Sequence, residues 1–431
     1  MVAAPSSTLA MRWLRRPSVG LLALIDQGVV SAGNFIAGVL MARAFGARDF
    51  GAFTLAWLIV EFMASLQFAA VIQPMQNIGA KEEETNRNRY YSAIAMQQVG
   101  IGAIASLLVW MTVNTIGDAF DAELGRLALP LCLATVSFQA YNFFRRYLFL
   151  RGKAVAALVN DVIRVGLQIG GLVVLPFAWS TTAESGIWLV AGACATAAVL
   201  GALSFGRFEW DWPTFCGLVV RHWTFSKWLL PSALMFWMTS QAFVLMSGVV
   251  LGPAATGSLK VAASITGLTN ILLQALDNFA PMQASQALHA GGREALLRYL
   301  TRLAVFIGSL LAFFVVLVSS DADGVVRLIY GQGYPNLGHM VHWLCATAVL
   351  YGLSVLLSIW AAAIERTHLI FASYAAATVF TAIAAYPLTN MLGMQGVLLG
   401  ALIVELIKVL ALVIPLVRWV RPMRTGALPA G

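Results

Sequence analysis

Charged residues are nearly absent from long stretches of this chain, and that absence limits its fold more than any other feature. Only 11% of the 431 residues are Asp, Glu, Lys or Arg, whereas 60% are apolar. The charges gather in short islands between apolar stretches of about 20 residues or more, the length that an α-helix needs to cross a bilayer. The sequence therefore predicts an all-α polytopic membrane protein.

Twelve apolar stretches are long enough to span a membrane. They cover residues 20–44, 51–75, 90–114, 126–148, 154–178, 185–205, 226–251, 256–280, 299–320, 340–363, 368–390 and 394–417. A large soluble domain does not accommodate so many consecutive helices of membrane length, so we expect about 12 transmembrane helices.

Lys and Arg concentrate in alternate short loops, including residues 12–16, 81–89 and 145–153. Cytoplasmic loops carry this excess, so we expect both termini in the cytoplasm and no cleavable signal peptide. The net charge of +8 is then the bias of a membrane protein whose basic islands lie against anionic lipid. Membrane lipids, and not nucleic acid, are the partners that this charge predicts.

Motifs for enzymatic chemistry are not recognisable. The four cysteines have no CxxC spacing, and His339 and His342 lack carboxylate partners in the sequence for a metal site. We find no phosphate-binding glycine loop, nucleophile elbow or HExxH motif. We therefore expect no catalytic residue, no metal and no bound cofactor, and a proton or sodium gradient as the energy source.

The second half of the chain repeats the first. Residues 45–56 align with 251–262, which pairs Gly46 with Gly252, and Pro74 then pairs with Pro281. Further on, Arg151 after the fourth span is aligned with Arg366 after the tenth.

One repeat is thus six helices. Six is an even number, so both units start on the same side of the membrane and are related by a pseudo-two-fold axis along its normal. We expect an N-lobe over 1–205, a cytoplasmic linker over 206–225 and a C-lobe over 226–431. The tryptophans and charges of the linker indicate a segment at the membrane interface. A transporter that moves two such lobes about a central cavity is one interpretation, and a purely architectural duplication is the other.

Polar side chains inside the spans gather on single helix faces. The first span carries Gln27 and Asn34 with Asp26 beside them, and the second carries Glu61. The eighth span carries Lys260, Asn270, Gln274 and Asp277. Such groups are costly in hydrocarbon and usually face a cavity, although small and polar residues also pack helices together. Asp26 and Asp277 lie near the cytoplasmic ends, where reaching to the interface is an equal alternative.

Two further spans contain oppositely charged residues three positions apart. Asp161 and Arg164 lie in the fifth span, and Glu405 and Lys408 lie in the twelfth. Residues at this spacing share a helix face, so each pair is expected to be a local ion pair. The alternative for Arg164 is a cation that binds an anionic substrate, because guanidinium matches phosphate bidentately.

Three motifs together resemble the polysaccharide-exporter branch of the MATE-like (MOP) transporter superfamily, to which the O-antigen flippases belong. They are Ala42-Arg43-Ala44-Phe45-Gly46 with Asp49-Phe50-Gly51, Leu328–Tyr334, and Phe144–Tyr147 with Arg151-Gly152-Lys153. The resemblance covers about residues 20–417.

This resemblance implies two six-helix lobes that flip a lipid-linked oligosaccharide on undecaprenyl diphosphate across the bacterial inner membrane by alternating access. The anionic substrate implies a cationic cavity, for which Arg43, Arg48, Lys260 and Arg164 are candidates. The polar residues Gln27, Asn34, Asn270 and Gln274 complete the predicted binding set, and Asp26, Glu61 and Asp277 are candidates for coupling. A polysaccharide polymerase and other assembly proteins are the implied partners.

Three other functions stay open. A multidrug or cation antiporter has the same architecture, and a lipid II flippase usually has two further spans, none of which follows residue 417. A membrane-embedded polysaccharide polymerase or ligase needs a large outer loop, and the longest expected here is the roughly 20 residues between 320 and 340.

Overall fold

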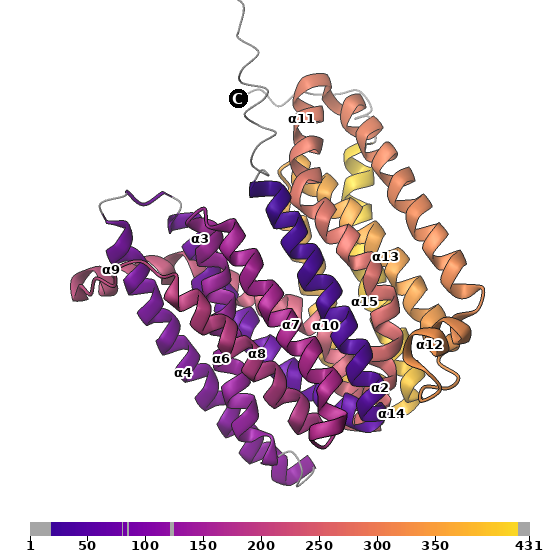
Figure 1. Cartoon of the computed structure of the whole chain (residues 1–431). Coiled ribbons are helices and arrows are strands. Elements are labelled where there is room, and N and C mark those ends of the chain that lie inside the picture. The colour runs from indigo at the N-terminus through magenta and orange to yellow at the C-terminus, as the bar shows by residue number, and fades with distance from the viewer. Residues whose placement is uncertain (1–18, 80, 84–85, 121–124, 421–431) are drawn as a thin grey trace, which may run out of the picture. The chain divides into compact units, whose positions relative to one another are not determined.

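The computed structural model describes residues 19–79, 81–83, 86–120 and 125–420. Within the helices it leaves out the side chains of 19–20, 116–120, 270–272, 274–275, 277–279 and 419–420. Every regular element of the described residues is a helix (Figure 1). The chain divides into two compact units, unit 1 over Met1–Ala233 and unit 2 over Leu234–Gly431.

Unit 1 holds the first six predicted spans and most of the linker between the repeats. Its elements are α2 (Val19–Gln67), the π-helix η1 (Phe68–Ile72), α3 (Gln73–Gly79), α4 (Arg87–Phe120), α6 (Ala128–Leu150), α7 (Ala154–Ala178), α8 (Ala183–Leu203) and α9 (Trp212–Ser226). Figure 1 shows the long helices of this unit running alongside one another, with the short α9 lying across them. The segment predicted as a linker is therefore part of the fold of unit 1, because α9 packs on α4, η1 and α3.

Unit 2 holds the remaining spans. Its elements are α10 (Leu229–Leu251), which begins in the last residues of unit 1, α11 (Pro253–Ser319), α12 (Ala322–Tyr330), α13 (Gly338–Ala363), α14 (Thr367–Leu392) and α15 (Met394–Val420). The 67 residues of α11 contain a break, because Gly291 and Gly292 leave helical backbone angles. They therefore form two successive spans.

All twelve predicted ranges fall on helices, which confirms the fold class. Nine helical stretches of the described residues are long and apolar enough to cross a membrane by length and composition. The first of them, Leu21–Gly79, is broken at Gly46 and holds two predicted spans. α6 adds a further helix of 23 residues.

The repeat is visible in the backbone. Gly46 has φ 73° and ψ 176°, and its aligned residue Gly252 has φ 89° and ψ 169°. This left-handed extended conformation is essentially restricted to glycine, and in both units it reverses the chain between two spans. The alignment at an offset of 206 therefore pairs two glycines that have the same backbone conformation between two spans.

The second aligned turn corrects the predicted pairing of Arg151 with Arg366. The connection between α6 and α7 has Gly152 at positive φ, and that between α13 and α14 has Glu365 there. Each turn then closes with the same backbone bond, Lys153 N to Leu148 O and Arg366 N to Ala361 O, both at 2.9 Å. Arg366 is thus the structural counterpart of Lys153. The sequence alignment that paired Arg366 with Arg151 is two residues out of register.

Candidate functional site

A cluster of buried charges joins three helices of unit 1. Asp26 lies on α2, Arg145 and Tyr141 lie on α6, and Asp161 lies on α7. Arg145 donates from Nε to Asp161 Oδ2 at 2.5 Å and from Nη2 to Asp26 Oδ2, and Tyr141 donates from its hydroxyl to Asp161 Oδ1 at 2.8 Å. Only 1% of Asp26 and none of Asp161 is exposed. We call these four residues the charge cluster.

Local helix geometry presents both donors of α6 to one site, because Tyr141 and Arg145 are one turn apart on one face. The cluster has two carboxylates for one guanidinium and therefore carries a formal charge of −1 when both are ionised. Asp26 Oδ1 is buried and accepts no hydrogen bond from the described residues. An unpaired buried carboxylate oxygen is costly, and Asp26 Oδ1 is the carboxylate oxygen of the cluster that is left without a donor among the described residues.

Arg164 extends this polar interior to the surface of the unit. It donates from Nη1 to Gln168 Oε1 at 2.9 Å and from Nη2 to Asn34 Oδ1 at 3.3 Å, and its guanidinium lies 5.1 Å from the centre of the Tyr141 ring. Arg164 is buried, whereas Asn34 is exposed. Its Nε has no hydrogen-bond partner among the described residues.

The predicted ion pair between Asp161 and Arg164 is wrong. The Asp161 carboxylate is bonded to Arg145 and Tyr141, and the amide oxygens of Gln168 and Asn34 accept from Arg164 instead. The spacing in α7 permits the local pair, but a cation from α6 occupies the carboxylate. Among the described residues, Arg164 is therefore bonded to amide oxygens and has no paired carboxylate.

Sequence reasoning assigned Arg145 to a basic cytoplasmic loop, and the structure corrects this. Arg145 lies inside α6, five residues before its end, and is 7% exposed. Asp26 is likewise buried within the protein and ion-paired to Arg145. One signal was available: Arg145 falls inside the predicted span 126–148, where a cation needs a partner.

The other predicted site residues of unit 1 lie elsewhere along α2. Gln27 is exposed on α2 and donates from Nε2 to Ser31 Oγ at 3.3 Å. Arg43 and Arg48 are exposed on either side of the break at Gly46, and Glu61 is half-buried in the second half of α2.

In unit 2, Lys260 is half-buried near the start of α11. The predicted side chains of Asn270, Gln274 and Asp277 lie outside the described residues. The predicted pair on α15 is confirmed, because Lys408 Nζ is 2.6 Å from Glu405 Oε1. The ammonium also lies 5.0 Å from the ring centre of Tyr374 and 5.5 Å from that of Tyr351.

Comparison with known proteins places this geometry in a family. A family described as "Polysaccharide biosynthesis protein" matches residues 40–339. The chain belongs to this family. No curated protein sequence matches it.

Solved structures share the fold at low identity. The chain is similar to an inward-facing multidrug resistance MATE family transporter of the MOP superfamily, with 16% identity, a TM-score of 0.72, and 93% of this chain and 96% of that chain covered. It is also similar to the lipid II flippase MurJ in an inward closed conformation, with 14% identity, a TM-score of 0.66, and 92% and 87% covered. A MOP superfamily transporter from Pyrococcus furiosus gives 14% identity, a TM-score of 0.61, and 93% and 94% covered.

The family and the fold agree with the motifs found in the sequence. The family is one of polysaccharide biosynthesis, the long apolar helices are those of a multi-pass membrane protein, and the fold is shared with these solved MATE, MurJ and MOP superfamily structures.

Proposed function

We propose that this transporter flips an oligosaccharide linked to undecaprenyl diphosphate across the bacterial inner membrane, with both termini in the cytoplasm. The observation that carries the proposal is Arg164, a buried cation that has, among the described residues, no paired carboxylate and no partner for its Nε. A diphosphate offers paired oxygens for a guanidinium and would bind Arg164 with charge-assisted hydrogen bonds in place of its present bonds to neutral amides.

The exposed Asn34 gives this cation a route to the surface of unit 1. Its amide accepts from Arg164 at 3.3 Å, a long bond that a phosphate oxygen replaces with a charge-assisted one. Arg43, Arg48 and Lys260 are the further cations for the head group. Gln27, Asn270 and Gln274, with Asn34, are the proposed amide partners of the sugars.

The charge cluster supplies a coupling step that needs no cofactor. A proton taken up at Asp26 removes one of the two negative charges that Arg145 balances and weakens the bond between α2 and α6. A proton or sodium gradient thereby changes the packing of unit 1 and drives alternating access. Asp26 is thus the first coupling candidate, with Glu61 and Asp277 as the others. A polysaccharide polymerase and other assembly proteins then take the translocated glycan.

The test follows the lipid-linked intermediate in cells. Deletion of the gene is expected to accumulate cytoplasm-facing lipid-linked glycan, and Arg164→Ala is expected to reproduce this with the protein still inserted and abundant. Arg164→Lys is expected to retain part of the activity, since an ammonium keeps the charge but not the bidentate geometry. Gly38→Ala, a substitution into open space on α2, is the matched control.

One observation favours a second function. The charge cluster has a net negative charge, which suits export of an organic cation in exchange for protons. A deletion that changes only drug sensitivity and builds up no lipid-linked glycan overturns the flippase proposal in favour of this antiporter.

A further inference from the structure

Helix α9 is held on unit 1 by one defined edge. It begins after Asp211, whose carboxylate accepts from Thr214 N at 3.0 Å, and Pro213 lies in its first turn. Leu218, His222 and Ser226 recur every four residues, and all three are buried. This spacing places them on one face of the helix, which is the protein-facing edge.

Two polar contacts fix the rotation of α9 about its own axis. Ser226 Oγ donates to Ala69 O of the π-helix η1 at 2.8 Å, and His222 Nε2 lies 3.4 Å from the hydroxyl oxygen of Tyr90 on α4. Burial lowers the pKa of His222 to about 4, so the imidazole is neutral at neutral pH and the packed edge carries no charge. The directions in which the remaining two edges of α9 face are therefore fixed relative to unit 1.

The second edge is an exposed apolar stripe. Its members are Trp212, Cys216, Val219, Val220 and Trp223. At 3.6 residues per turn they occupy an arc of about 100°. Trp212 is 62% and Trp223 61% exposed, so most of the tryptophan surface of this stripe is uncovered within the described residues.

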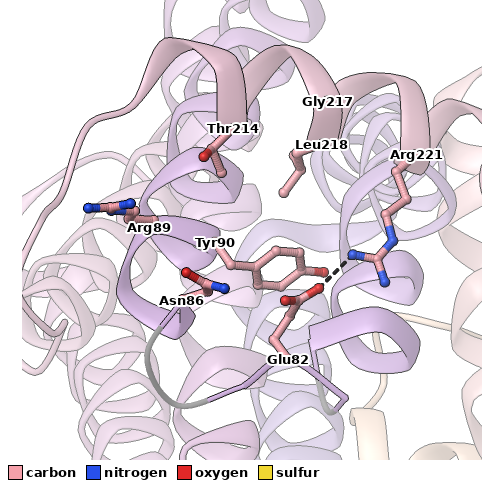
Figure 2. Close-up of a pocket in the computed structure, with 8 residues that line it drawn as sticks. All are labelled: Glu82, Asn86, Arg89, Tyr90, Thr214, Gly217, Leu218 and Arg221. Atoms are coloured by element: carbon pink, nitrogen blue, oxygen red, sulfur yellow. Dashed lines mark hydrogen bonds and ion pairs between the residues drawn. The ribbon is translucent and has the colours of Figure 1, made fainter.

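The third edge is polar and borders a pocket of about 320 Å³. Thr214, Gly217 and Arg221 of α9 line this pocket opposite Glu82 and Tyr90, and Figure 2 shows Arg221 pointing toward Glu82. Arg221 Nη1 is 2.5 Å from Glu82 Oε1. The Arg221 side chain is 55% exposed in this ion pair, which identifies the third edge as the one that faces water.

The three edges lie roughly 120° apart around the helix axis, counted at 100° per residue. A helix that lies in the membrane surface beside a membrane protein has three neighbours in this arrangement: protein on one side, lipid below and water above. Tryptophan is also the side chain most typical of the membrane–water interface.

We propose that α9 is a surface helix of the bilayer, with its tryptophan stripe among the acyl chains and its Arg221 edge in water. The partner is a bilayer surface with anionic head groups, because the exposed cations Arg207 and Lys227 flank the helix. This inference goes beyond the proposed function and depends only on the chain crossing a membrane. By its bond to Ala69, the helix ties the irregular turn of η1 to the lipid surface.

The test uses a nitroxide label on each of two edges of α9. Cys216 is an exposed native cysteine on the stripe, and Thr224 is exposed on the water-facing edge. One variant keeps Cys216, with the other cysteines, Cys132, Cys194 and Cys345, replaced by alanine. Its matched control adds Cys216→Ser and Thr224→Cys. Both are reconstituted in vesicles of phosphatidylethanolamine and phosphatidylglycerol, and collisions with oxygen and with a water-soluble nickel chelate are measured.

At Cys216 we expect oxygen collisions to exceed nickel collisions several-fold, and at Thr224→Cys we expect the reverse. Equal access of nickel to both positions means that α9 stands in water and overturns the proposal. Exclusion of both reagents from Cys216 means that protein covers the stripe, which overturns it equally. Replacing phosphatidylglycerol with phosphatidylcholine is expected to lower the oxygen preference at Cys216, and an unchanged ratio overturns the role of anionic lipid.

The alanine replacements at buried Cys194 and Cys345 risk unfolding the protein. Wild-type protein labelled briefly is the second measurement, since Cys194 and Cys345 are buried and Cys132 is half-buried, which leaves Cys216 as the most exposed of the four thiols. It is expected to give the same several-fold preference for oxygen, and a preference for nickel overturns the proposal without any substitution.

Discussion

Each unit carries a buried ion pair, but the two are built differently. In unit 1, Arg145 joins carboxylates on two other helices, and the three residues are 119 and 16 positions apart in the sequence. In unit 2, Glu405 and Lys408 are neighbours on one helix, and two tyrosine rings flank the ammonium. The first arrangement makes helix packing depend on charge, whereas the second neutralises a lysine locally. Equal backbones in a repeat therefore do not imply equal chemistry.

The largest difference between the units is expected on removing the cation. Arg145→Met leaves two buried carboxylates uncompensated and is expected to cost about 3–5 kcal/mol of unfolding free energy. Thermal unfolding in detergent and the amount of inserted protein measure the loss. The triple variant with Asp26→Asn and Asp161→Asn should recover most of it, and a triple variant no more stable than the single one contradicts the network.

Substitutions at the equivalent glycines Gly46 and Gly252 test whether the two units share the same turn. Gly46→Ala and Gly252→Ala are each expected to cost about 1–3 kcal/mol, because alanine is strained at these backbone angles. An added Cβ meets nothing within 4 Å at either position, so the cost is that of the backbone alone. Thermal unfolding of the two variants should shift by similar amounts, with Gly38→Ala as the near-neutral control. A large difference between the two shows that the repeat does not share this turn.

The local pair of unit 2 is expected to matter less than the cluster of unit 1. A double-mutant cycle with Lys408→Met and Glu405→Gln should give a coupling energy of about 1–2 kcal/mol. The coupling is small because, in Lys408→Met, the unpaired Glu405 carboxylate becomes neutral by binding one proton. Unfolding midpoints of the four proteins supply the cycle. A coupling as large as the loss at Arg145 removes the distinction between local and cross-helix pairs.

The smallest effect concerns the packing of α9 in unit 1. His222 has a pKa of about 4 in the folded protein against about 6.5 when unfolded, so the unfolded state binds the proton more tightly. The packing is near full strength above about pH 7 and weakens as the pH falls toward 4, by about 1.4 kcal/mol at pH 5.5. Proteolysis of the segment around α9 between pH 7.5 and 5 measures this. His222→Gln should remove the pH dependence, and a variant that keeps it assigns the effect to another group.

The positions of the spans and one of the two local ion pairs followed from the sequence. Apolar stretches of membrane length locate helices because each helix satisfies its own backbone hydrogen bonds in lipid. Glu405 and Lys408 were predictable as a pair since three-residue spacing fixes neighbours on a helix before any tertiary packing. Gly46 and Gly252 were predictable as equivalents because a backbone turn of this kind limits the residue to glycine.

Only the tertiary structure decided which charges meet. The same spacing that located Glu405 and Lys408 pointed to Asp161 and Arg164, and there it failed because Arg145 of another helix reaches the carboxylate. The rotation of α6 about its axis, the depth of Arg145 and the edge of α9 that faces outward all depend on how neighbouring helices pack. Sequence spacing specifies contacts within a helix, and contacts between helices are fixed by side-chain packing over the whole unit.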